Sequence, residues 1–291
     1  MNPMQLSNRA IAWMLSLFRD AFGVVAFLAC ERLLLQLSGF AALAAAMMGL
    51  SFGVIGAIRT DSLVLLLMGA GWFVAVNLAY FVGTKMLTAC AVTLKNTPSK
   101  ISSEDYLEVL GLSCVVVLLV LLGGSAYWAI KVGAMTPVWW ALGGAVIAIW
   151  FAAMYLNPSL ISTRVHPSAS AGEDAVSLSV LVLKTFVRLA PMVFSVLTLT
   201  GAGLLGWGLW RLVGSEGFEL FQGGVASFSG FAIVALGLLY PLYAYLGFVL
   251  GYLILDLARS ILAMPRLLQS QAGTVVDESV PTTEAVKLVV A

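Results

Sequence analysis

Charged residues are scarce in this chain. Aspartate, glutamate, lysine and arginine make up 10% of its 291 residues, whereas soluble domains carry about one-quarter. The formal net charge is +1, so the sequence lacks the basic excess typical of nucleic-acid-binding proteins, and we expect no nucleic-acid partner. Apolar residues account for 61% of the chain, which favours a membrane protein.

Residues that carry chemistry are also rare. The only histidine, His166, precedes a proline in a polar segment, where a solvated side chain is expected. A b-type haem needs axial ligands, usually two histidines in a membrane bundle, and a zinc site gathers several His, Cys or carboxylate ligands. The sequence has no P-loop, HExxH or CxxC motif. We therefore expect no catalytic residue, cofactor or metal, and we expect Cys30, Cys90 and Cys114 to be buried free thiols.

Long apolar runs recur along the chain. Runs of about 20 residues suffice for a helix to cross roughly 30 Å of hydrocarbon, and these runs are continuous rather than alternating, which favours helices over a barrel. The sequence predicts an all-α, polytopic membrane helix bundle, with six transmembrane helices arranged as three hairpins and amphipathic helices on the cytoplasmic face. The predicted spans are 39–58, 62–82, 107–130, 137–156, 190–212 and 229–255.

Polarity divides the chain into three parts. Residues 1–38 are predicted as an N-terminal amphipathic interfacial region, 39–268 as the six-span domain and 269–291 as a cytoplasmic tail. Residues 21–37 are apolar but contain Glu31 and Arg32, and burying such a pair in the bilayer is unfavourable without partners. We favour a surface-lying or half-inserted segment there, with a seventh span as the alternative.

Two amphipathic segments carry candidate lipid-facing residues. Arg9 and Arg19 lie on the polar side of the N-terminal helix, and Lys184 and Arg188 lie on the polar arc of a helix over 170–190. We expect both helices to lie at the headgroups, with these basic residues toward anionic lipid. Pro191 is predicted to mark the turn into the fifth span.

Small and polar residues within the spans suggest packing and hinge positions. Two glycine pairs spaced four residues apart are predicted to form helix-packing faces, within the chain or between two copies. They are Gly49 with Gly53 and Gly247 with Gly251. Asn77 is a polar amide at mid-span, expected to bond a neighbouring helix or a substrate, and Pro241 is expected to kink the sixth span.

The distribution of basic residues predicts the orientation. With six spans, twelve lysines and arginines fall on the side of both termini, and three fall on the other side. The positive-inside rule makes the first side cytoplasmic, so we expect a multi-pass protein of a bacterial inner membrane with N- and C-termini in the cytoplasm. The three outer residues are Arg59, Lys131 and Arg211.

Two classes of function fit this pattern. Absent chemistry, small-residue faces and a polar tail favour a non-catalytic scaffold or accessory subunit of a larger membrane assembly, with protein partners or a homo-oligomer. The alternative is a transporter-like, channel-like or lipid-handling protein that uses no ion-coupling carboxylate, because the six predicted core spans contain no ionisable residue at mid-depth.

Overall fold

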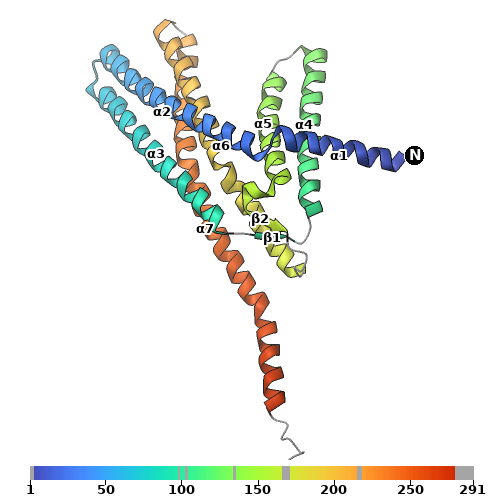
Figure 1. Cartoon of the computed structure of the whole chain (residues 1–291). Helices are drawn as coiled ribbons and strands as arrows, with labels where there is room; N and C mark the ends of the chain where they lie inside the picture. The colour runs from blue at the N-terminus through green and yellow to red at the C-terminus, as the bar shows by residue number, and fades with distance from the viewer. Residues whose placement is uncertain are drawn as a thin grey trace, which may run out of the picture.

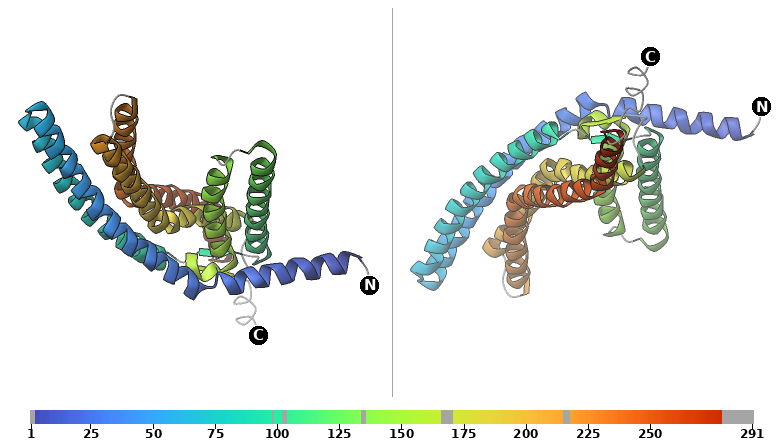
Figure 2. Two further views of the ribbon diagram at one scale, coloured as in Figure 1. Left: turned by 90° about the horizontal axis from the view of Figure 1, so that it is seen from above. Right: turned by 90° about the horizontal axis from the view of Figure 1, so that it is seen from below.

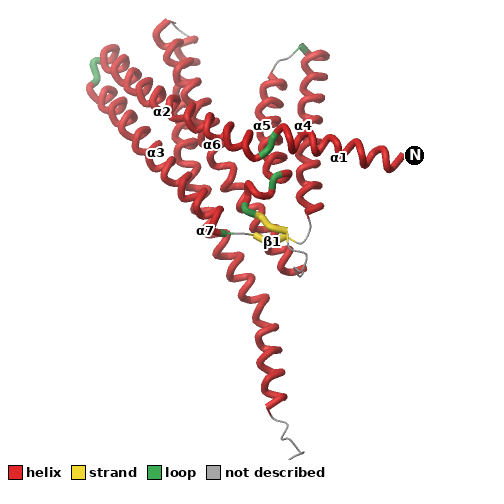
Figure 3. Tube along the Cα trace, viewed as in Figure 1, coloured by secondary structure: helices red, strands yellow, loops and turns green. Residues whose placement is uncertain are grey.

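The computed structural model describes residues 3–97, 99–101, 104–133, 136–165, 171–214 and 218–278. These residues form seven α-helices, one 3-10 turn and two three-residue strands (Figure 3). Five of the helices are long and apolar enough to cross a membrane. The described chain therefore has the architecture of a multi-pass helical membrane protein.

Consecutive long helices pack as pairs. The first pair is α2 (Val24–Thr60) with α3 (Leu63–Asn96), the second α4 (Glu104–Val132) with α5 (Thr136–Leu156), and the third α6 (Ala171–Gly214) with α7 (Phe218–Glu278). The turn expected at 59–61 is confirmed, because α2 ends on Asp61 in the left-handed conformation (φ 52°) and the Ser62 N–H donates to the Ala57 carbonyl at 3.3 Å.

Helices α6 and α7 form the central pair, and the other two pairs spread away from it. The α2–α3 pair lies on one side of them and the α4–α5 pair on the other (Figures 1 and 2). The tips of all three pairs lie at the same end of the molecule, and the two short strands lie at the opposite end, which we call the base (Figure 1). Helix α1 (Pro3–Ala21) projects sideways from the base, and α7 continues beyond it.

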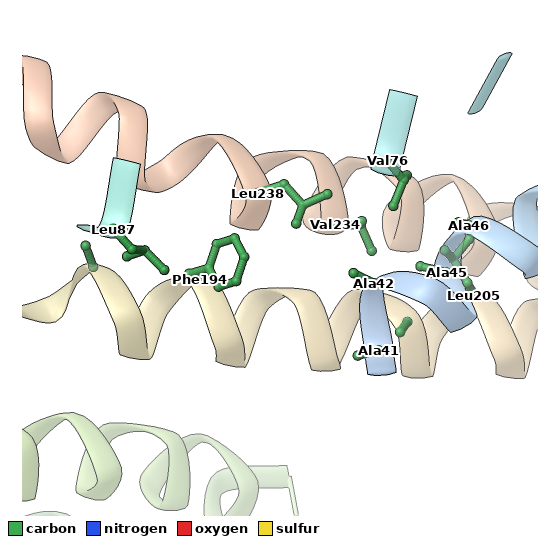
Figure 4. Close-up of a cluster of buried hydrophobic side chains, with 12 residues drawn as sticks. Ala41, Ala42, Ala45, Ala46, Val76, Leu87, Phe194, Leu205, Val234 and Leu238 are labelled. Atoms are coloured by element: carbon green, nitrogen blue, oxygen red, sulfur yellow. The ribbon is translucent and has the colours of Figure 1, made fainter. Parts of the chain in front are cut away.

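The main core joins α2, α3, α6 and α7. Figure 4 shows apolar side chains of these helices pointing toward one another. Alanines on α2 and glycines elsewhere keep the backbones close, since small residues allow near approach of membrane helices. The buried members include Ala42, Ala45, Val76, Phe194, Leu205, Val234 and Leu238.

A miniature parallel sheet closes the base. Strand β1 (Ser99–Ile101) pairs with β2 (Thr163–Val165), which follows the 3-10 turn η1 (Pro158–Ile161). The Ser99 N–H donates to the Ser162 carbonyl at 3.2 Å. No strand is predicted for either segment, because the residues that pair are 64 positions apart in the sequence.

Three predicted boundaries fall inside continuous helices. The boundary after residue 38 lies within α2, and the boundary between 268 and 269 lies within α7. The predicted turn at Pro191 is wrong, since Pro191 lies inside the 44-residue α6. Proline lacks an N–H, yet neighbouring groups in membrane helices let the helix continue through it. The predicted loop over 214–228 is also wrong, because α7 already begins at Phe218.

Candidate functional site

The polar arc of α6 faces the protein. Ser177, Lys184 and Thr185 are buried, whereas Val182 and Phe186, between or beside them in sequence, are exposed. This distribution is the reverse of a soluble helix. It fits a helix whose outward neighbours are apolar and whose polar side chains find partners inside the chain.

Lys184 holds the miniature sheet against α6. Its side chain is 0% exposed, and its ammonium Nζ donates to the Ser99 Oγ at 3.0 Å and to the Ser162 carbonyl at 3.1 Å. The Ser99 hydroxyl also bonds the Thr163 hydroxyl at 2.9 Å. Charge-assisted hydrogen bonds are stronger than neutral ones, so Lys184 ties segments 85 and 22 residues away to one helix.

Arg188 forms a buried ion pair with Glu31. Two guanidinium nitrogens reach the two carboxylate oxygens, Nη1 to Oε1 at 3.1 Å and Nη2 to Oε2 at 2.5 Å. The side chains are only 10% and 12% exposed. The guanidinium also lies over the Phe27 ring, 5.2 Å from its centroid. The Phe27 ring contacts Trp150 of α5 as well, with ring centroids 4.3 Å apart. The pair therefore links α2 to α6 in a bidentate geometry.

The two basic residues of α6 therefore do not lie on an outward face. The prediction that Lys184 turns toward headgroups is wrong, because its side chain is fully buried and binds groups within the chain. Arg188 binds Glu31 within the chain and also lines a groove, so its contact with headgroups stays a prediction. The two arginines of α1 behave as expected for an exposed helix. Arg9 is exposed, and Arg19 pairs with Glu108 of α4 at 3.1 Å with both side chains more than 40% exposed.

A groove of about 400 Å³ opens beside the ion pair. Residues of α2, α3 and α6 line it. Glu31 and Arg188 form its charged part, and the rest is mainly apolar. The lining residues are Glu31, Leu35, Tyr80, Thr84, Leu87, Thr88, Cys90, Ala91, Leu94, Val187, Arg188 and Pro191.

Asn77 and Pro241 are not brought to this groove. Asn77 is exposed on α3, and its amide donates to the Phe73 carbonyl of the same helix at 2.7 Å. Pro241 is buried within α7, and its carbonyl accepts the Cys90 thiol at 3.8 Å. The amide of Asn77 thus bonds its own helix rather than a neighbour.

The predicted packing glycines fall into two groups. A Cβ added at Gly49 would collide with Trp72, and one at Gly53 would meet the Gly69 Cα at 2.7 Å, so both lie at the α2–α3 contact. Gly251 lies against Leu183 of α6. A Cβ at Gly247 would meet nothing within 4 Å, so its predicted packing role within the chain is wrong.

Two segments match enzyme motifs by letter, although we expect no catalytic or cofactor-binding residue in either. Residues 49–53 read GLSFG, a GxSxG pattern, and residues 201–206 read GAGLLG, a GxGxxG pattern. Both motifs work at a turn between a strand and a helix, whereas these segments lie inside α2 and α6. The Ser51 hydroxyl donates to the Met47 carbonyl at 3.0 Å, so it is held by its own helix.

Other chemical groups are dispersed. Among the described residues, no three His, Cys, Asp or Glu side chains gather closely enough to hold a metal ion. Cys90 is buried and Cys114 half-buried, but Cys30 is exposed, so the prediction of three buried thiols is wrong for Cys30. His166 and residues 279–291 of the predicted tail lie outside the described residues.

Comparison with known proteins identifies no relative: no family model, curated protein or solved structure matches this chain. The site therefore rests on its own geometry. Glu31 is the residue of this site to which the sequence analysis assigned no role. The sequence indicated only that a carboxylate in an apolar helix needs a partner.

Proposed function

We propose that this chain is a six-span membrane protein acting as a non-catalytic scaffold or accessory subunit of a larger membrane assembly. Five long apolar helices support the membrane setting. Helix α5 supports a sixth crossing, because its 21 residues would extend about 31 Å, close to the hydrocarbon thickness. A continuous α2 would then carry the first crossing together with the segment that we had placed at the surface.

The proposed orientation puts the base in the cytoplasm. The helix tips near Arg59, Lys131 and Arg211 lie at the end of the molecule opposite the base (Figure 1). Most basic residues of the sequence belong to the base side, so the positive-inside rule favours a cytoplasmic base with both termini on that side.

One observation carries the scaffold role, namely how little of the outer spans is buried. In α3 and α4, 11% and 17% of the span residues are buried, against 56% in α6. The α4–α5 pair meets the rest of the chain mainly near the base, through Phe27, Trp150 and the neighbouring apolar cluster. The spread pairs leave long apolar flanks on which helices of partner chains can pack.

A lipid-handling role is the second candidate, and the groove at Glu31 favours it. Glu31 is an ionisable residue within the helix bundle, because α2 is continuous from Val24 through the first predicted span. Glu31 is bound bidentately by Arg188, so it is not a free carboxylate of the type that couples ion transport. The scaffold role and the lipid-handling role differ in what should cover the exposed flank of the α4–α5 pair. The scaffold role requires a helix of a partner chain there.

Photo-crosslinking in native membranes tests the scaffold role. A benzophenone amino acid at the exposed positions Val116 and Val120 of α4 should give one discrete protein adduct. The same probe at buried Val115 is the matched control. Adducts to lipid alone at both exposed positions, together with purification of the full chain as a homogeneous monomer in mild detergent, would contradict the subunit role. A protein adduct that is lost when residues 269–291 are removed would assign the tail to the same interface.

A further inference from the structure

The groove between α2, α3 and α6 combines two kinds of wall. Leu35, Leu87 and Val187 give it an apolar side, and the Glu31–Arg188 pair gives it a charged end. Thr88 and Ala91 line it while also being exposed, so the groove opens to the outside of the helix pair. Its volume of about 400 Å³ is within the range of sites for small ligands.

Arg188 retains hydrogen-bonding capacity at this site. Its side chain is nine-tenths buried, and its Nε is a buried donor with no hydrogen-bond partner among the described atoms. A buried donor without an acceptor is unfavourable by about 1–3 kcal/mol. An oxygen-rich ligand beside the guanidinium would relieve this deficit.

The charges around the groove favour an anionic ligand. Glu31 is the only acidic residue of α2, and Arg188 already neutralises it, while α3 contains no acidic residue. Arg32 follows Glu31, Lys85 follows Thr84 and Lys95 follows Leu94, and all three basic side chains are exposed. The α2 and α3 walls of the groove therefore carry three exposed basic residues next to its lining, and such residues attract anions at a membrane surface.

The depth of the site suits a lipid headgroup. Arg188 lies 23 residues from Arg211 along α6, which corresponds to about 35 Å of helix. That is slightly more than the hydrocarbon thickness of about 30 Å. If Arg211 marks one boundary, as its position over the Trp207 ring at 5.2 Å suggests, then Arg188 lies at the other boundary, where phosphate and ester oxygens begin.

We propose that this groove binds one anionic glycerophospholipid, with the phosphate or ester oxygens beside Arg188 and the start of an acyl chain along Leu35 and Leu87. The volume holds a headgroup and its ester groups, while the remaining chain lies in the bilayer. The inference rests on the membrane setting proposed above but not on the scaffold role, so a negative crosslinking result leaves it intact.

Lipid retention in purified protein tests the proposal. The full chain is reconstituted in nanodiscs of equal parts phosphatidylglycerol and phosphatidylcholine, extracted in mild detergent, and analysed by native mass spectrometry. We expect one retained phosphatidylglycerol per chain. Ala91→Trp should fill the groove and lower this retention by at least about tenfold. Val92→Trp is the matched control, because Val92 is exposed at the same depth but does not line the groove.

A second variant separates headgroup recognition from shape. Arg32→Gln combined with Lys85→Gln and Lys95→Gln removes the three exposed basic side chains beside the groove and leaves its lining unchanged, so it should abolish the preference for phosphatidylglycerol over phosphatidylcholine. Wild-type retention in Ala91→Trp, or an unchanged preference in the triple variant, would overturn the proposal. Inorganic phosphate that raises the melting temperature of the wild-type chain as much as phosphatidylglycerol does would also overturn it, since the site would then be an ion site.

Discussion

Two helices of this chain carry similar amphipathic patterns and use them in opposite ways. Helix α1 leaves its polar side open, with Arg9 exposed and Arg19 in an ion pair that is nearly half exposed. The first half of α6 turns its polar side inward, with Lys184 fully buried and Arg188 nine-tenths buried. An amphipathic period shows that a helix has two faces, but the partners available in the rest of the chain decide which face is inward.

The partners of α6 are specific groups on distant segments. Glu31 neutralises Arg188, and a serine hydroxyl with a backbone carbonyl receives the ammonium of Lys184. Among the side chains of α1 that the structure describes, Arg19 has such a partner, Glu108 of α4, and this pair lies at the surface. The comparison predicts that replacing the polar residues of α6 lowers the free energy of unfolding far more than replacing those of α1.

The largest effect is expected for Glu31→Leu. This change leaves the Arg188 guanidinium buried without its carboxylate, and breaking a buried pair in this way destabilises a protein by about 3–5 kcal/mol. The measurement is the free energy of unfolding in mixed micelles titrated with a denaturing detergent. The double variant Glu31→Leu with Arg188→Leu should regain most of the loss. Equal stability of the single and double variants would show that the pair is not buried.

Lys184→Met should have the next largest effect. It removes the donor that serves Ser99 and the Ser162 carbonyl, and unsatisfied buried polar groups are unfavourable by about 1–3 kcal/mol. The matched control is Lys95→Met on the exposed surface of α3, which should stay within about 0.5 kcal/mol of wild type. The two variants are compared by the same unfolding titration. Identical stabilities would contradict the burial of Lys184.

A related comparison concerns Gly53 and Gly247. Both belong to glycine pairs with the same spacing, and the spacing does not show whether a pair faces another helix of the chain. Gly53→Ala places a Cβ 2.7 Å from the Gly69 Cα, and such overpacking should destabilise the α2–α3 pair by about 1–3 kcal/mol. The Cβ of Gly247→Ala meets no atom of the described residues within 4 Å, so this change should stabilise α7 by up to about 1 kcal/mol through helix propensity. Thermal unfolding of both variants checks the difference. A destabilised Gly247→Ala would indicate that a second chain packs there.

The smallest effect is expected for Arg19→Gln. Its ion pair with Glu108 joins two side chains that are 44% and 42% exposed, and exposed pairs contribute about 1 kcal/mol or less. Unfolding titrations of Arg19→Gln and Glu108→Gln at low and high salt provide the measurement. A loss as large as that of Glu31→Leu would remove the distinction between α1 and α6.

Much of the helical layout could be predicted from the sequence. Long apolar runs and polar breaks located α3, α4 and α5 and the turn at Asp61, because each break combines charge or proline with a change in hydropathy. Pro191 misled the prediction, since a proline ends helices in water more reliably than in a membrane, where neighbours compensate for the missing N–H. The two short strands could not be predicted from the sequence, because their pairing depends on residues that are 64 positions apart.

The candidate site was harder to predict than the helices. Glu31 was recognised as a carboxylate that needs a partner, and Arg188 was assigned to the headgroups. The two residues are separated by 157 positions, and nothing local indicates that they meet. The polar arc of α6 was correctly traced around the helix, but its direction was wrong for Lys184, because the pattern says nothing about which surroundings each face meets. Pairing in three dimensions, rather than periodicity, decides that direction.

Site-directed spin labelling on α6 tests the central claim, that its polar arc faces the protein. In a chain with Cys30, Cys90 and Cys114 replaced by serine or alanine, a nitroxide is placed singly at Ser177, Val182, Thr185 and Phe186, and its mobility and collisions with oxygen and a nickel chelate are recorded in liposomes. The account predicts immobile, inaccessible labels at Ser177 and Thr185 and mobile, accessible labels at Val182 and Phe186. The reverse pattern, with the polar positions accessible and the apolar ones protected, would contradict it.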